Sequence, residues 1–130
     1  DGFKSVNDTY GHAAGDQVLR IAAGKLRSCC REVDTAARMG GDEFALILPG
    51  VSDPDSAALV ANRIIVALGE PIAIDGDSCS VGASVGIALF PRDGHTIDAL
   101  VRAADAAMYA SKAAGNWVLP RYRDRFPGLY

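Results

Sequence analysis

Apolar residues follow two patterns along the chain, and these patterns predict alternating helices and strands. Three stretches repeat apolar residues every three to four positions, as an amphipathic helix does, and they span roughly 16–31, 53–69 and 97–114. Residues 2–8 are expected to form a short helical turn, and residues 10–16, which carry a glycine near each end, are expected to form a loop. Short apolar runs predict strands at 36–39, 44–48, 71–74 and 79–90, and residues 117–119 suit an additional edge strand.

The apolar stripes of the three long helices predict the core. Their members are Val18, Ile21, Ala22, Leu26, Cys29, Cys30, Ala57, Val60, Ala61, Ile64, Ile65, Leu68, Leu100, Val101, Ala104, Ala107 and Met108. Residues 84–90 are nearly all apolar or small, as expected for a central strand that is covered on both faces. Polar capping residues at 52–53 and at Thr96 begin the second and third helices, and glycines end them.

Two glycines lie between two of the predicted strands and are followed by two acidic residues. Gly40 and Gly41 readily adopt the positive φ angles of a tight turn, so they predict a β-hairpin with Asp42 and Glu43 at its tip. Adjacent carboxylates repel each other, and a bound divalent cation commonly reduces this repulsion. Mg²⁺ suits the role because it binds one or two carboxylates together with substrate phosphates. In an arbitrary hairpin, the simpler interpretation is that these two acids only solvate the turn.

Composition limits the class of protein. With 130 residues, of which 49% are hydrophobic, the chain is expected to form one ordered domain. The net charge of −3 gives no basic field for a polynucleotide, although a small anionic ligand needs only a local site. Three cysteines without a C-x-x-C spacing favour free thiols in a reducing compartment, and no apolar run is long enough to span a bilayer. We therefore expect a cytoplasmic domain without membrane contact.

The residues from Gly40 to Phe44 resemble the signature of GGDEF domains, the diguanylate cyclases. Further segments resemble the family in the same order, namely 1–8, 11–16, 31–34, 84–88, 91–94 and 104–109. The resemblance predicts a GGDEF domain over 1–119 that lacks its first strand, with 120–130 as a tail or linker. It implies an α+β fold of the ferredoxin-like, nucleotidyl-cyclase palm type, with a largely antiparallel central sheet flanked by helices.

The resemblance implies that two GTP molecules are condensed into cyclic di-GMP and two pyrophosphates, with Mg²⁺ or Mn²⁺ as cofactor. Asp42 is then a metal ligand, and Asp42 and Glu43 are the catalytic residues. Each domain holds one GTP in this scheme, so a homodimer is expected to be the active unit. In the family, the metal has a second aspartate ligand, which is the first aspartate of an Asp-x-Asp segment. Asp1 matches the later aspartate of that segment, so the given sequence has no match for this second ligand.

Asn7 and Asp16 match the family's guanine-binding pair. A carboxylate can accept both donors of the guanine Watson–Crick edge, and an amide can contact O6 or N3. The simpler interpretation is that Asn7 lies at a helix end and that Asp16 is a helix N-cap. Within the whole array of matches we favour guanine binding.

The resemblance assigns triphosphate binding to Phe3, Lys4, Gly41 and Lys112. The backbone N–H groups of the early helical turn suit phosphate oxygens, as helix N-termini generally do. Lys112 also suits the C-terminal end of a helix on electrostatic grounds alone. The family usually has an arginine after the glycine that matches Gly115, whereas here Asn116 follows.

An Arg-x-x-Asp segment precedes the hairpin glycines and matches the family's inhibitory product site. Arg31 presents a planar fork of donors that suits guanine and phosphate, and Asp34 can accept from the guanine amine. Arg38 is a further candidate for this site. The simpler interpretation of Arg31 and Asp34 is a solvated charge pair after a helix.

Two rival functions remain at this point. One is a catalytically weak or inactive regulatory module that binds GTP or cyclic di-GMP and controls an adjoining domain. The other is a cyclase that uses ATP, which Asp16 disfavours because a carboxylate mismatches the acceptor N1 of adenine.

Overall fold

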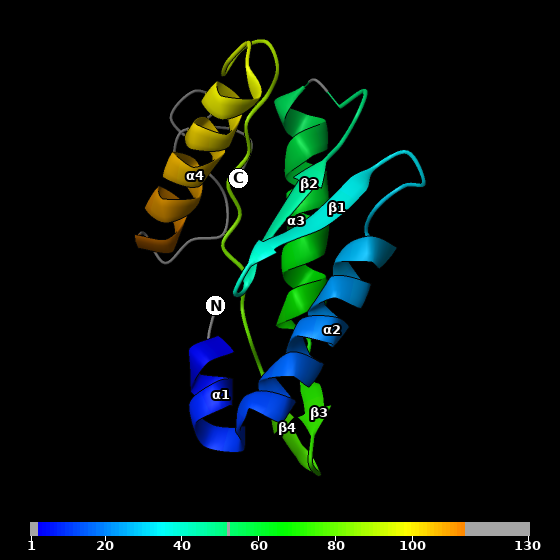
Figure 1. Ribbon diagram of the computed structural model, residues 1–130. Coiled ribbons are helices and arrows are strands. Elements are labelled where there is room, and N and C mark those ends of the chain that lie inside the picture. The colour runs from blue at the N-terminus through cyan, green and yellow to red at the C-terminus, as the bar shows by residue number, and fades with distance from the viewer. Residues whose placement is uncertain (1–2, 52, 114–130) are drawn as a thin grey trace. The chain divides into compact units, whose positions relative to one another are not determined.

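The computed structural model describes residues 3–51 and 53–113, and its helices and short antiparallel strands are shown in Figure 1. Their order along the chain is α1 (Phe3–Tyr10), α2 (His12–Ser28), β1 (Thr35–Gly40), β2 (Glu43–Ile47), α3 (Pro54–Gly69), β3 (Ile72–Ile74), β4 (Asp77–Cys79) and α4 (Ile97–Ala113). The predicted mixture of helices and antiparallel strands is therefore confirmed.

The described residues divide into two compact parts. The first part comprises 3–49 and 66–83, and the second comprises 50–51, 53–65 and 84–113. Helix α3 contributes its last residues to the first part and the rest to the second.

Helices α1 and α2 form the framework of the first part, together with the β3–β4 hairpin. Their shared core consists of Val6, Ala14, Val18, Ile72, Ile74 and Val81. A single residue separates the two helices, because Gly11 has a φ of 92° and turns the chain sharply (Figure 1). The loop predicted over 10–16 is therefore wrong: α2 already begins at His12, and Gly15 is a buried residue inside it.

The hairpin predicted around the glycine pair is confirmed. Strands β1 and β2 pair antiparallel, with Thr35 opposite Ile47 and Gly40 opposite Glu43, and a bulge lies between Arg38 and Gly40. Gly40 and Gly41 have φ angles of 145° and 53°, which side-chain-bearing residues rarely adopt. Backbone geometry at these two positions thus requires glycine, and it places Asp42 in the turn.

The second part is built around the packing of α3 and α4 on an extended segment. Ala57, Leu89 and Ala107 form its buried cluster, with Val51 and Ile87 packed against them. The absence of a side chain at Gly86 permits a close approach, because a Cβ atom there would overlap the carbonyl oxygen of Ala104 and lie 2.6 Å from the backbone nitrogen of Met108.

The predicted starts of α3 and α4 are confirmed by side-chain caps. The Asp53 carboxylate accepts a hydrogen bond from the backbone N–H of Ser56 at 2.9 Å, and the Thr96 hydroxyl accepts one from Ala99 at 3.1 Å. The α3 core stripe is also largely as expected, since Ala57, Ala61, Ile64 and Leu68 are buried. Val101 of α4 was expected inside and is instead 47% exposed.

The strand predicted over 79–90 is wrong except for its first residue. Residues 80–89 carry no strand, and the described strands form two separate two-stranded sheets, β1–β2 and β3–β4. A strand is held by ladder hydrogen bonds to a neighbour, and each described strand pairs only with the other strand of its own hairpin. The apolar character of the segment serves packing instead, with Val81 and Leu89 buried. The edge strand suggested at 117–119 lies outside the described residues.

No helix in the described part of the chain combines the length and apolar character that crossing a membrane requires.

Candidate functional site

The hairpin tip presents two carboxylates to solvent. Asp42 is a turn residue, Glu43 is the first residue of β2, and both are exposed. The turn is braced by Arg38, whose Nε donates a hydrogen bond to the carbonyl oxygen of Gly41 at 2.9 Å. This bond places Arg38 at the hairpin tip, and its contribution to the product site stays a prediction.

The contact between α1 and α2 brings the two expected guanine-binding residues onto neighbouring positions. Asn7 lies in α1 opposite Gly15 of α2, where a Cβ atom would overlap Asn7 Oδ1 and lie 2.8 Å from Asn7 Cγ. Asp16 is the next residue of α2 and is exposed. The N-cap interpretation of Asp16 is wrong, because the N-cap is Gly11 and Asp16 lies inside the helix.

Asn7 carries an unusual polar atom. Its Oδ1 is buried and has no hydrogen-bond partner among the described residues. A buried acceptor without a donor typically costs about 1–3 kcal/mol, and native proteins retain few such groups. This oxygen therefore needs a structural explanation, and its place against Gly15 of α2 gives one.

The expected phosphate-binding residues divide between the two parts of the molecule. Phe3 and Lys4 begin α1; Phe3 is half-buried and packs against the first core, whereas Lys4 is exposed. Lys112 lies in α4, which belongs to the second part. The early residues Asp1 and Gly2 lie outside the described ranges.

Arg31 and Asp34 form a closed cluster directly after α2. Arg31 Nη2 donates to Asp34 Oδ1 at 2.7 Å, Arg31 Nε lies 3.2 Å from both carboxylate oxygens, and the Arg31 backbone N–H donates to Asp34 Oδ2 at 2.7 Å. A second bond from Arg31 Nη2 reaches the carbonyl oxygen of Pro49 at 2.6 Å, which ties the cluster to the end of the hairpin. The Asp34 side chain is 4% exposed, and that of Arg31 is 54% exposed.

The bond from Arg31 sets the charge state of Asp34. The guanidinium hydrogen bonds hold the pKa of the Asp34 carboxyl below its ordinary value, and the Arg31 backbone N–H adds to this effect. The same bonds raise the pKa of Arg31. Both groups are therefore charged at neutral pH, and the pair is prearranged before any ligand binds.

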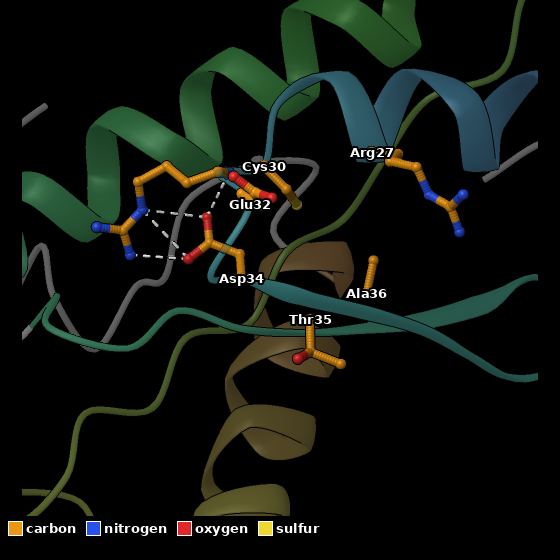
Figure 2. Close-up of a pocket in the computed structure, with 7 residues that line it drawn as sticks. Arg27, Cys30, Glu32, Asp34, Thr35 and Ala36 are labelled. Carbon is orange, nitrogen blue, oxygen red and sulfur yellow. Dashed lines mark hydrogen bonds and ion pairs between the residues drawn. The ribbon is translucent and has the colours of Figure 1, made fainter.

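A hollow of about 440 Å³ opens beside this cluster, and Figure 2 shows its walls. Its lining residues are Arg27, Cys30, Arg31, Glu32, Asp34, Thr35 and Ala36. The volume lies in the range of small-molecule sites. The Arg27 side chain extends away from Asp34 in this view. Arg27, Cys30 and Thr35 were not predicted as lining residues from the sequence. The signal in the sequence was that Arg27 lies four residues before Arg31.

Cys30 is not a reactive thiol in this hollow. Burial raises the pKa of its thiol, and the nearby Asp34 carboxylate raises it further. The group is therefore protonated at neutral pH and contributes to the wall as a small apolar side chain.

The hairpin carboxylates fit a divalent ion that takes further oxygens from elsewhere. In the chain as far as it is described, no group of three or more His, Cys, Asp or Glu side chains is gathered at one point. Asp42 and Glu43 nevertheless offer adjacent carboxylates, and Mg²⁺ commonly binds one or two carboxylates while phosphates and water complete its shell.

Comparison with known proteins decides the family. The family model described as "Diguanylate cyclase, GGDEF domain" matches residues 1–117. The chain belongs to the GGDEF family. Among its relatives is MucR of Pseudomonas aeruginosa, a bifunctional diguanylate cyclase/cyclic di-GMP phosphodiesterase that is 44% identical over 116 residues, or 89% of this chain. The match spans 17% of MucR, so the chain corresponds to only a small portion of that protein's length.

Solved GGDEF domains share the fold. The GGDEF domain of TpbB from Pseudomonas aeruginosa is 43% identical, with a TM-score of 0.83 over 88% of this chain and 71% of that one. The GGDEF domain of DgcB from Caulobacter crescentus, solved in complex with c-di-GMP, is 32% identical, with a TM-score of 0.80 over 91% of this chain and 70% of that one. The predicted nucleotidyl-cyclase palm is thereby confirmed.

Replacing Arg31 with alanine tests the electrostatic cause of the Asp34 shift. We expect the Asp34 pKa to rise in Arg31→Ala toward the ordinary value of about 3.9, because the guanidinium donors are lost. NMR titration of the Asp34 carboxyl carbon measures this. Arg27→Ala is the matched control, since Arg27 lines the same hollow without a hydrogen bond to Asp34 among the described contacts, and it should leave the Asp34 pKa unchanged.

The Arg31–Asp34 pair also makes the stability of the fold depend on pH. The Asp34 pKa is lower in the folded chain than in the unfolded chain, so the pair stabilises the fold fully above about pH 4 and the contribution is lost as pH falls through the folded pKa. An Asp34 pKa that is equal in the wild type and in Arg31→Ala would contradict this account.

Proposed function

We propose that this GGDEF domain is a diguanylate cyclase that condenses two GTP molecules into cyclic di-GMP and two pyrophosphates. The observation that carries the proposal is the hairpin tip. Two glycines with positive φ hold Asp42 and Glu43 in solvent, and neither carboxylate has a hydrogen-bond or ion-pair partner among the described residues. The relationship to named diguanylate cyclases supports the same reading.

In this proposal, Asp42 would hold a Mg²⁺ or Mn²⁺ ion through its carboxylate, and Glu43 would be the second catalytic carboxylate. When bound, the ion supplies charge neutralisation to the phosphates and orients them. The 3′-hydroxyl of one GTP gives up its proton to water and its oxygen bonds to the α-phosphorus of the other GTP. The bond from that phosphorus to the bridging oxygen breaks, and pyrophosphate leaves. The reciprocal attack closes the ring, so two pyrophosphates are released for each cyclic di-GMP.

The guanine base is held between α1 and α2. Asp16 is exposed and accepts the N1–H and exocyclic amine of guanine, while the Asn7 amide contacts an acceptor on the base. This pairing disfavours adenine, whose N1 is an acceptor and would face the carboxylate of Asp16 without a proton between them.

Triphosphate binding is assigned to Phe3, Lys4, Gly41 and Lys112. The backbone N–H groups at Phe3 and Lys4 open α1 and meet the phosphates, and Gly41 lets the turn approach them without a side chain. Lys112 supplies a positive charge. Since each domain then holds one GTP, two copies must face each other, and the active unit is a homodimer.

The Arg31–Asp34 cluster is proposed as an inhibitory site for cyclic di-GMP. The pair is charged and prearranged beside a hollow of about 440 Å³. Asp34 and Pro49 hold Arg31 Nε and Nη2, so Nη1, which has no hydrogen bond among the described contacts, is left to donate to a guanine edge or a phosphate. The DgcB structure, which contains c-di-GMP, supports the presence of such a ligand in the family.

The place of this domain in its protein is part of the proposal. We take residues 1–119 as the GGDEF domain and 120–130 as a tail or linker. GTP is the substrate and the three cysteines are free thiols, so we assign the domain to the cytoplasm.

A second candidate function is a regulatory module that binds GTP or cyclic di-GMP with little or no turnover. The observation in its favour is Asn116, which follows Gly115 where the family usually has a phosphate-binding arginine. MucR is a bifunctional diguanylate cyclase/cyclic di-GMP phosphodiesterase, so a GGDEF relative can share its chain with another activity.

Asp42→Ala tests the metal role. We expect turnover of GTP to fall by at least about a hundredfold, because a single electrostatic stabilising group is often worth that much, while the circular dichroism spectrum stays unchanged. The measurement is formation of cyclic di-GMP from GTP and Mg²⁺ by the protein that carries this domain. Asp105→Ala is the control: it removes an exposed carboxylate from α4, away from the hairpin in sequence, and should retain activity. Full turnover in Asp42→Ala would remove Asp42 from the reaction.

Arg31→Ala tests the product site. Hydrogen bonds to charged groups are worth about 1.5–3 kcal/mol, so we expect the inhibitory concentration of cyclic di-GMP to rise at least about tenfold. The initial rate measured with little product present should stay close to that of the wild type. Arg63→Ala, which removes an exposed arginine of α3 that does not line the hollow, is the control and should leave inhibition unchanged. Equal inhibition of Arg31→Ala and the wild type would count against the site.

A further inference from the structure

Gly15 is the point at which α2 touches the side chain of Asn7. A Cβ atom on Gly15 would overlap Asn7 Oδ1, lie 2.8 Å from Asn7 Cγ and lie 3.3 Å from Phe3 Cε2. Gly24 belongs to the same helix and has no atom within 4 Å of the corresponding position. Since helix propensity disfavours glycine at both positions, only Gly15 has a packing reason to be glycine.

The absence of a side chain at Gly15 leaves room for Asn7 Oδ1 to turn inward against α2. Asn7 Oδ1 is buried without a hydrogen-bond partner among the described residues, so no donor holds it there. The hydrogen that glycine carries in place of a Cβ atom points at this oxygen and gives it a weak C–H···O contact. The amide is planar, and with Oδ1 against α2 its Nδ2 donors are directed to the other side.

We propose that Gly15 is a positioning residue for the nucleotide base. It lets Asn7 Oδ1 pack against α2, so that Asn7 Nδ2 is directed toward a hydrogen-bond acceptor of a 6-oxopurine base such as guanine. The inference rests on the proposed function, in which Asn7 and Asp16 bind guanine. It adds a division of labour, because Asn7 donates to an acceptor of the base while Asp16, the next residue along α2, accepts its N–H groups.

The geometry also says how a substitution at Gly15 would act. The atoms nearest to a new methyl group are at the end of the Asn7 side chain, which can rotate, and not in the backbone of α1. The Asn7 amide therefore swings away while the two helices stay packed. Alanine also favours the helix at this position, so Gly15→Ala should remain folded.

The test compares four proteins: the wild type, Gly15→Ala, Asn7→Ala and the double variant. Each is titrated by calorimetry in Mg²⁺ with an α,β-methylene analogue of GTP, which cannot release pyrophosphate. We expect Gly15→Ala and Asn7→Ala each to weaken binding about tenfold, and the double variant to bind like Asn7→Ala alone, because both changes remove the same contact. Gly24→Ala is the matched control on α2 and should bind like the wild type.

A second ligand separates positioning from general disruption. The inosine analogue keeps the carbonyl and the ring acceptors of guanine but lacks the exocyclic amine that Asp16 accepts. Gly15→Ala should weaken both analogues by the same factor and so preserve the preference for guanine over hypoxanthine. A merely structural defect would displace Asp16 as well and would erase that preference.

Three results would overturn the proposal. Wild-type affinity for the analogue in Gly15→Ala would show that the contact between Gly15 and Asn7 does not affect binding. A double variant that binds the analogue much more weakly than Asn7→Ala would show that Gly15 does not act through Asn7. If even the wild type fails to bind the GTP analogue, the proposed function fails and the positioning role fails with it. NMR of the Asn7 side-chain amide distinguishes these failures: its resonances should move in Gly15→Ala and not in Gly24→Ala, whether or not a nucleotide binds.

Discussion

The close approach of α1 and α2 at Gly15 is the constraint on which the rest of this structure depends. It is possible only because Gly15 has no side chain and because Gly11, with a φ of 92°, turns the chain within one residue. The contact buries the first core and presses Asn7 against the residue that precedes Asp16. One packing event thus stabilises the fold and arranges the residues proposed to bind the base.

The two other sites are local structures that need little from the remainder of the chain. The hairpin tip depends on two positive-φ glycines and on the bond from Arg38 Nε to the Gly41 carbonyl oxygen. The product-site candidate depends on four hydrogen-bond contacts between Arg31 and Asp34 and on the anchor at Pro49. Each arranges charged groups before a ligand arrives, and such preorganisation lowers the cost of binding.

Patterns that report local geometry were predictable from the sequence. The glycine pair predicted the hairpin, and Asp53 and Thr96 predicted helix starts, because a turn or a cap depends on a few adjacent residues. The segment 80–89 was not predictable, since its apolar residues suit packing as well as strand pairing and only tertiary partners decide between them. Gly15 was misplaced in a loop for a related reason: in sequence a glycine suggests flexibility, whereas here it provides space for Asn7 from another helix.

The central claim is that the hairpin carboxylates hold a cation that binds the phosphates of a guanine nucleotide, and that the guanine base binds between α1 and α2. The most direct measurement is calorimetric titration of this domain with the non-reacting GTP analogue, once in excess Mg²⁺ and once in excess chelator. The account predicts clear binding with Mg²⁺, at least about tenfold weaker binding without it, and no comparable binding of the adenine analogue. Binding that is absent in Mg²⁺, or that is equally strong in chelator, would contradict it.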